Sequence, residues 1–248
     1  MDIPDLIDFA PPECLERGFD LDWYMTRAER FALLHLLAKF KPDLSLEVGT
    51  FRGGSLQALS LHSKHVISVD IDPQASARLA GRYDNVTYKV GDSSIILPNL
   101  IDQYGDDLGF ILIDGNHGEQ GVRTDINSVL RIKPRRPLGI VMHDSFMPCC
   151  RQGMRTASWA GSPYVHYVEL DFVPGCIVPN YSSVNGVMVG GFGFALLRSE
   201  PRTSDLEIFE SQIEKFNAIK RYAEDMVVRR KPSLLRRGAN KLQRILHA

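Results

Sequence analysis

Long apolar runs are missing from this 248-residue chain, so no segment reaches the roughly 18 residues that a membrane-spanning helix needs. The start of the chain is acidic and lacks the basic region of a signal peptide. The four cysteines show no Cys-x-x-Cys spacing, which argues against a zinc site and against a disulfide framework. The formal net charge is −1, so no bulk polyelectrolyte partner is indicated. We expect a cytoplasmic protein.

Five apolar stretches, each followed by a helical pattern, form the centre of the chain. They lie at residues 44–48, 65–70, 86–90, 110–113 and 138–142. Successive β-then-α units predict a parallel sheet with helices on both faces. Two later stretches, 164–170 and 193–198, have no clear helix between them and predict an antiparallel hairpin at the sheet edge. The expected fold is therefore an α/β, Rossmann-like, doubly wound sheet of seven strands.

The chain is expected to divide into three parts: residues 1–42, an acidic arm and a helix over 23–40; residues 43–200, the main domain; and residues 201–248, a helical, basic tail. Residues 229–248 hold seven Lys and Arg and no acid, with leucines and isoleucines between them. This pattern favours contact with a membrane surface, an anionic partner or a second subunit, and the alternative is a solvated helix packed on its own domain. Nucleic acid is not expected, because no aromatic platform accompanies the basic residues. The arm and the tail are candidate contacts of a homodimer.

One stretch, residues 44–55, combines a buried strand, a glycine-rich turn and the start of a helix. Such a unit presents backbone N–H groups and a helix N-terminus to a ligand. The dinucleotide fingerprint needs a third-position glycine near the pyrophosphate, but that position is Phe51. Glu47 would repel a phosphate and attract an ammonium group. The sequence therefore favours S-adenosylmethionine over a dinucleotide.

Acidic residues end most of the predicted strands. Glu47, Asp70, Asp114 and the pair His143-Asp144 each end a strand, and Asp92 follows the third one. A single acid of this kind is often a helix cap. Because ligands of open α/β sheets bind beyond the carboxyl ends of the strands, the whole set predicts a site at that edge.

The motifs at 46–55, 69–72, 91–93 and 113–117 resemble the successive motifs of class I S-adenosylmethionine-dependent methyltransferases. The resemblance covers about residues 43–198 and is closest to metal-dependent O-methyltransferases, of the catechol and sugar types. Cephalosporin hydroxylase-like proteins have a similar pattern. The resemblance implies that the Glu47–Gly49 turn and Ser55 hold the methionine part, Asp70 the ribose, and Ile71, Asp92 and Ser93 the adenine. The expected cofactor-binding residues are Glu47, Gly49, Thr50, Phe51, Ser55, Asp70, Ile71, Asp92, Ser93 and Asp114.

The resemblance also implies that Asp114 and Asp144 bind a metal ion. A physical argument agrees: neighbouring strands lie about 4.8 Å apart, and two carboxylates brought together at that range need a cation. Oxygen ligands favour Mg²⁺, or Ca²⁺, over zinc. Such an ion would lower the pKa of an acceptor hydroxyl.

Two histidines are candidate general bases. His143 stands where metal-dependent relatives commonly have an acid, and imidazole is a better base than Mg²⁺ ligand. We therefore expect His143 to act as a base rather than a metal ligand. The alternative is a structural histidine that only forms hydrogen bonds with the backbone. His117 is the second candidate, and its alternative is an ordinary residue at a helix N-terminus.

The predicted function is metal-dependent transfer of a methyl group from S-adenosylmethionine to a hydroxyl oxygen. A sugar or oligosaccharide is the first expected acceptor, because residues 146–190 are richer in Pro, Gly and Tyr than a hydrophobic slot would be. Catechol, phenol and acyl-CoA acceptors are alternatives. A hydroxylase-like or dehydrogenase-like enzyme, or a non-catalytic binding protein, could use the same fold.

Overall fold

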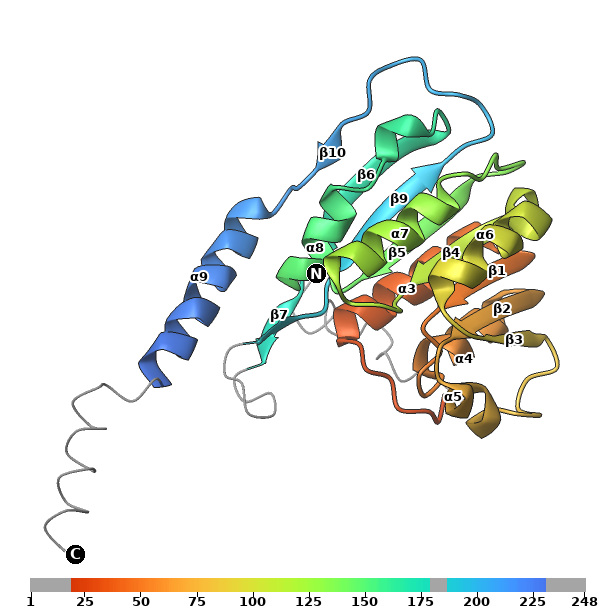
Figure 1. Cartoon of the computed structure of the whole chain (residues 1–248), viewed down its shortest axis with the longest axis horizontal. Helices are drawn as coiled ribbons and strands as arrows, with labels where there is room; N and C mark the ends of the chain where they lie inside the picture. Colours follow the sequence, from red (N-terminus) through yellow and green to blue (C-terminus); the bar gives the residue numbers. More distant parts are fainter. Residues whose placement is uncertain (1–18, 179–186, 231–248) are drawn as a thin grey trace, which may run out of the picture.

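A central sheet runs through the protein in the order β10-β6-β9-β5-β4-β1-β2-β3. The computed structural model describes residues 19–178 and 187–230 (Figure 1). Five parallel strands form most of the sheet: β1 (Leu44–Val48), β2 (His65–Asp70), β3 (Val86–Val90), β4 (Leu108–Ile113) and β5 (Leu138–His143). Strands β1, β2 and β3 have the predicted bounds, whereas β4 begins two residues before its predicted stretch and β5 ends one residue after it. The agreement arises because each strand is a short apolar run followed by turn residues.

The remaining strands lie beside β5. Strand β9 (Phe192–Leu197) runs antiparallel between β5 and β6 (Val165–Val173), and the two-residue β10 (Ile208–Phe209) pairs with β6. The predicted fold class is confirmed, and β10 adds one short strand to the predicted seven. Between β6 and β9 the chain forms a separate hairpin from β7 (Cys176–Val178) and β8 (Val187–Val189).

Helices cover both faces of the sheet (Figure 1). Side chains of α3 (Arg27–Phe40), α4 (Gly54–His62) and the end of α5 (Pro73–Arg78) pack into one core. Those of α6 (Ser93–Tyr104), α7 (Glu119–Val129) and α8 (Pro148–Arg155) pack into the core of the other face. Two 3₁₀ turns are η1 (Gly105–Asp107) and η2 (Trp159–Gly161). Helix α9 (Ile213–Arg230) packs through Phe216 on the β7–β8 side.

Helix α3 begins later than residue 23, the predicted start. Thr26 is its N-cap, and the Thr26 hydroxyl accepts from the Glu29 N–H at 3.3 Å. The Glu29 carboxylate in turn accepts from the Thr26 N–H at 2.5 Å, which completes a capping box. Residues 19–26 are therefore free of the helix and run along the carboxyl edge of the sheet.

Two predicted segments fall largely outside the described residues: the acidic arm, except for residues 19–22, and the basic tail beyond residue 230. Elements of all three predicted ranges nevertheless join the described fold, α3 from the first and β10 and α9 from the third. The division at residues 42 and 200 stays a prediction. Across the described ranges, no helix is both long and apolar enough to span a membrane.

Candidate active site

A cavity of about 860 Å³ opens at the carboxyl ends of the parallel strands. Its walls come from residues 23–26, from the loops after β1 to β5, and from the β7–β8 hairpin. Most of the predicted site residues line it: Gly49, Phe51, Asp70, Ile71, Asp92, Ser93, Asp114, His117, His143 and Asp144. Glu47, Thr50 and Ser55 do not appear in its wall.

Glu47 lies beneath the glycine turn, fully buried. Its two carboxylate oxygens accept hydrogen bonds from the hydroxyls of Ser55 at 2.6 Å and Ser68 at 2.5 Å. Thr50 shares a hydrogen bond of 2.6 Å with the same Ser68 hydroxyl. Burial raises the pKa of Glu47 to about 7, although the two serine hydrogen bonds oppose this effect. Glu47 and Ser55 therefore hold each other and the base of the turn, and their contact with the ligand stays a prediction.

Three residues of the turn have positive φ angles: Gly49, Phe51 and Gly53. Gly49 has φ 95°, and a β-carbon at this position would lie 2.0 Å from the Asp114 carbonyl oxygen. Phe51 has φ 46°, and its N–H donates to Asp70 at 2.8 Å. The Asp72 N–H donates to the other Asp70 oxygen at 2.8 Å. Asp70 is thus fixed at the end of β2 while its remaining lone pairs are available to a ligand in the cavity.

Exposed apolar side chains border this half of the cavity. Ile71 is 71% exposed and lies directly after Asp70. The rings of Tyr24 and Phe51 meet edge to face with 5.3 Å between their centroids. Large apolar groups left open to solvent beside a cavity are typical of a surface that a flat ring covers on binding.

The opposite half holds a cluster of charged side chains from the ends of β4 and β5. His143 Nδ1 lies 2.9 Å from Asp114 Oδ1. The His117 ring bridges the two acids, with Nε2 at 3.4 Å from Asp114 and Nδ1 at 3.0 Å from Asp144. Asp144 has φ 60°, and its second oxygen accepts from the Gly190 N–H at 2.5 Å. The structure thus brings together all four predicted catalytic and metal residues.

A fifth member of the cluster, Glu29 of α3, was missed in the sequence. It is 1% exposed, and its Oε1 lies 3.3 Å from His143 Nε2. The same carboxylate accepts from the N–H groups of Thr26 and Gly191. The Thr26-x-x-Glu29 spacing signals a helix start, but nothing local in the sequence links that helix to β5.

Charge pairing sets the protonation of the cluster. Hydrogen bonds to Asp114 and Asp144 raise the pKa of His117 to about 10, against the effect of burial. Burial alone would lower the pKa of His143, but Asp114, Glu29 and Asp144 hold it well above its ordinary value. Burial alone would raise the pKa of Asp114, but the contacts with His143 and His117 outweigh this effect and lower that pKa to about 2. These contacts favour the imidazolium form of His143, whereas the sequence predicts a neutral base, and the role of His143 as a base stays a prediction.

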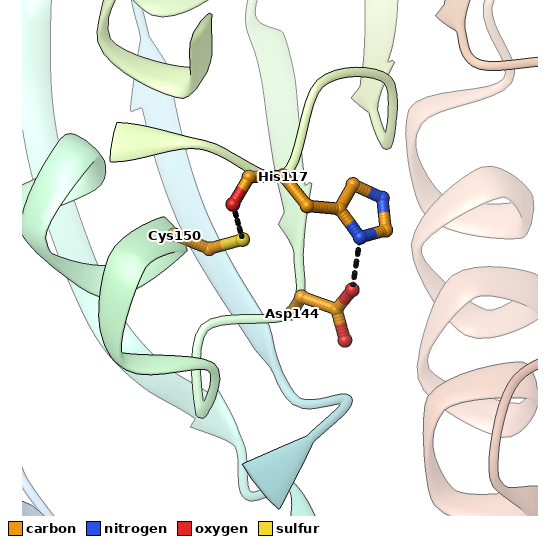
Figure 2. A group of neighbouring side chains, drawn as sticks. All are labelled: His117, Asp144 and Cys150. Carbon is orange, nitrogen blue, oxygen red and sulfur yellow. Dashed lines mark hydrogen bonds and ion pairs between the residues drawn. The ribbon is translucent and has the colours of Figure 1, made fainter. Parts of the chain in front are cut away.

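The residues present fit a divalent cation in part. Asp114, His143 and Asp144 place one donor atom each within 4.8 Å of one another, and so do His117, Asp144 and Cys150. Figure 2 shows the His117 ring directed toward Asp144, while its backbone carbonyl faces the Cys150 thiol. The two aspartates converge on a cationic ring, a position that suits a metal ion. His143 suits one less, because both of its nitrogens already face carboxylates.

The comparisons with known proteins agree with this architecture. Residues 46–145 match the model of a family described as a methyltransferase domain. No curated protein matches the chain. An O-methyltransferase from Bacillus cereus, solved in complex with SAH, is 18% identical with a TM-score of 0.51, over 67% of this chain and 79% of that one.

Two further solved structures have similar scores. TomG, an O-methyltransferase from Streptomyces achromogenes involved in tomaymycin synthesis and solved in complex with SAM, is 20% identical with a TM-score of 0.54. This match covers 71% of this chain and 82% of TomG. Cofactor-bound Rv0187 from MTB is 21% identical with a TM-score of 0.52, over 80% of this chain and 92% of that one. Identities this low show the fold alone. Together with the family match over residues 46–145, they show that this chain has the fold of these methyltransferases.

Proposed function

We propose that this enzyme transfers the methyl group of S-adenosylmethionine to a hydroxyl oxygen of a small acceptor. The observation that supports this most is that the glycine turn and the charged cluster line one cavity, in which Gly49 lies directly beside the Asp114 carbonyl. Methyl transfer needs a donor and a nucleophile in line at van der Waals contact, and one cavity can hold both. The SAH and SAM bound to the O-methyltransferases of similar fold support the same donor.

In this proposal the cofactor lies on the glycine-turn half. Asp70 accepts hydrogen bonds from the ribose hydroxyls, and Ile71 packs on the adenine, whose edge reaches Asp92 and Ser93. The backbone at Gly49 and Phe51 borders the methionine part, which directs the sulfonium toward Asp114. Glu47 contributes from below by fixing Ser55 and Ser68.

Replacing Asp70 with alanine should weaken S-adenosylhomocysteine binding by about 1.5–3 kcal/mol, the range for hydrogen bonds to a charged group. Isothermal titration calorimetry measures this loss. Asp72→Ala is the matched control, because Asp72 only caps α5 through the Gln74 N–H. Unchanged affinity in Asp70→Ala would remove Asp70 from the ribose role.

His117 is the residue best placed to take the acceptor's proton. Its side chain is 45% exposed and lines the cavity, whereas that of His143 is 8% exposed. In the reaction the O–CH₃ bond forms as the S–CH₃ bond breaks, S-adenosylhomocysteine leaves, and the hydroxyl proton passes to His117 Nε2 or Nδ1. His117 must be neutral for this, and His143 and Glu29 hold Asp114 in position meanwhile.

We also propose that Asp114 and Asp144 bind a divalent metal ion, Mg²⁺ first. Such an ion, when bound, would lower the pKa of an acceptor hydroxyl and compete with the His117 imidazolium for the same carboxylates. The sequence argument that two bare carboxylates require a cation is weaker in the structure, because two histidines already lie against them. Metal dependence therefore needs a direct test.

Chelation should restrict activity to alkaline pH. Without metal, the rate should rise with pH until about 10, because only neutral His117 accepts a proton. Adding Mg²⁺ after EDTA should restore activity near neutral pH. The measurement is a pH–rate profile of the chelated and the restored enzyme. Two identical profiles would mean that no ion acts at Asp114 and Asp144.

For the acceptor, we propose a phenolic or other hydroxyl on an apolar body, ahead of a sugar. The order differs from the sequence-based expectation because the described part of residues 146–190 supplies an apolar wall. The side chains that form it are Met147, Cys176, Val178, Val187 and Val189. Apolar walls with few polar groups favour a ligand of matching character over a polyhydroxylated one.

The test of the whole proposal is transfer of labelled methyl groups to a panel of phenols, acyl-CoA phenols and sugars, with and without EDTA. Labelled phenol ethers are the expected product. If only sugars were labelled, the acceptor would be a sugar and not a phenol. Calorimetry with S-adenosylhomocysteine against NAD would expose the dehydrogenase-like alternative.

A further inference from the structure

A buried carboxylate that the proposed reaction does not use lies between α6 and α7. Asp125 of α7 is 1% exposed, and its Oδ1 accepts a hydrogen bond of 2.7 Å from the Ser93 hydroxyl. Its Oδ2 is buried and has no hydrogen-bond partner among the described residues. Ser93, the first residue of α6, also lines the cavity. The carboxylate is therefore joined to the cavity through one hydroxyl.

Asp125 stands directly behind the cavity wall. A β-carbon added to Gly115, which lines the cavity, would lie 3.8 Å from Asp125 Oδ2. It would also approach a methyl group of Val48 to 2.9 Å, so the wall has no room for a side chain there. Asp125 does not line the cavity itself, and Ser93 is its route of influence on a ligand.

The bond fixes the direction of the Ser93 hydroxyl. An ionised carboxylate only accepts hydrogen bonds, and a serine hydroxyl has one proton to donate. Burial raises the pKa of Asp125 to about 6, with the Ser93 hydrogen bond opposing and Asp92 adding to the shift. Above that pH the carboxylate is charged and holds the Ser93 proton. Ser93 Oγ then offers only lone pairs to the cavity.

We propose that Asp125, acting through Ser93, makes this corner of the cavity selective for a purine that carries a hydrogen-bond donor at position 6. The inference rests on the proposed function, in which the adenine edge reaches Ser93. The amino group of adenine can donate to Ser93 Oγ. The carbonyl of hypoxanthine places a second acceptor there, so neither its oxygen nor Ser93 Oγ finds a hydrogen-bond donor. Asp125 is thus a specificity-determining residue that never touches the ligand.

A purely structural role for Asp125 gives a different result. If the carboxylate only joins α6 to α7, its removal lowers stability and weakens all ligands alike. The ratio of the affinities for two ligands that differ only at position 6 of the purine would not change. This ratio is therefore the readout.

The experiment compares S-adenosylhomocysteine with S-inosylhomocysteine by calorimetry, at a pH well above the pKa of Asp125. The native protein should bind the adenine ligand about 10- to 100-fold more tightly, the range for one buried acceptor left unpaired. Asp125→Leu keeps the branched arrangement of the side-chain heavy atoms but accepts no hydrogen bond, so Ser93 can turn and donate, and the two ligands should bind about equally. Asp125→Asn keeps an oxygen for Ser93 and should keep most of the discrimination.

Ser93→Ala provides a second test if Asp125→Leu fails to fold, since it should also abolish the discrimination. Ser128→Ala is the matched control: it removes another α7 hydroxyl bond, to the Thr124 carbonyl, away from the cavity. Equal binding of both ligands by the native protein would overturn this inference but not the proposed function. Full discrimination in Asp125→Leu or in Ser93→Ala would have the same meaning. If the native protein binds neither ligand, the proposed function fails, and this inference fails with it.

Discussion

Replacing His143 with alanine should lower the free energy of unfolding by about 3–5 kcal/mol, the usual cost of removing one partner from a buried ion pair. His143 lies between Asp114 at 2.9 Å and Glu29 at 3.3 Å. Glu29 is 1% exposed, so its charge would stay buried with the N–H groups of Thr26 and Gly191 but without the His143 ring beside it. Denaturant unfolding of the two proteins measures the loss.

The pH dependence of this loss follows from the direction of the shifts. The folded-state pKa of His143 lies above its unfolded value, so its contribution is complete below about 6.5 and disappears as the pH rises through the folded value. Asp114, with a folded pKa of about 2, contributes above its unfolded value and loses the contribution as the pH falls toward 2. The difference between native and variant should therefore be largest between about pH 4 and 6.5.

Glu29→Gln in the His143→Ala background should recover part of the stability, because it removes the unpaired charge. His35→Ala, an exposed histidine on the same helix as Glu29, should change stability by less than about 0.5 kcal/mol. A loss below about 1 kcal/mol in His143→Ala, the value of an exposed pair, would mean that water reaches the Glu29 carboxylate.

Replacing His117 with alanine should lower kcat by about 10²–10⁴-fold, the span expected when a general base is lost. Affinity for S-adenosylhomocysteine should stay unchanged, because the ring faces the two aspartates rather than the glycine turn. The backbone should hold its place too, because the His117 carbonyl accepts from the Cys150 thiol (Figure 2). It also accepts from the Cys149 thiol, and the substitution leaves both bonds intact. Single-turnover kinetics with a saturating cofactor measures the effect.

Cys149→Ala is the matched control for this prediction, since it removes a bond to the same carbonyl without altering the ring. Its kcat should equal that of the native enzyme. If His117→Ala keeps a normal kcat at every pH, the proton goes elsewhere, and the bridge between Asp114 and Asp144 is only structural.

Much of the fold could be predicted because its signals are local. Each parallel strand is a short apolar run that ends at turn residues, and the predicted bounds of β1, β2 and β3 are those of the structure. The gathering of Asp70, Asp114 and Asp144 at one edge followed from the parallel topology alone. That edge is where the cavity lies.

The missed features depend on contacts between distant parts of the chain. Glu29 reaches His143 only because α3 packs across the sheet, and no sequence spacing reports that contact. Glu47 lies at the end of a strand as Asp70 does, yet its carboxylate faces the α4 side. There it accepts hydrogen bonds from the hydroxyls of Ser55 and Ser68. The apolar wall of β7 and β8 was missed because the prediction rested on the Pro, Gly and Tyr content of residues 146–190 and not on the position of its valines, of which Val178, Val187 and Val189 line the cavity.

The contact of Gly49 with the Asp114 carbonyl has a consequence for how acceptor choice can change. Main-chain atoms of two adjacent strands set the spacing between the donor and acceptor halves, and any side chain at residue 49 would force them apart. The acceptor wall, by contrast, comes from a hairpin outside the main sheet. Substitutions or length changes in that hairpin can therefore retune acceptor preference while the distance over which the methyl group travels stays constant.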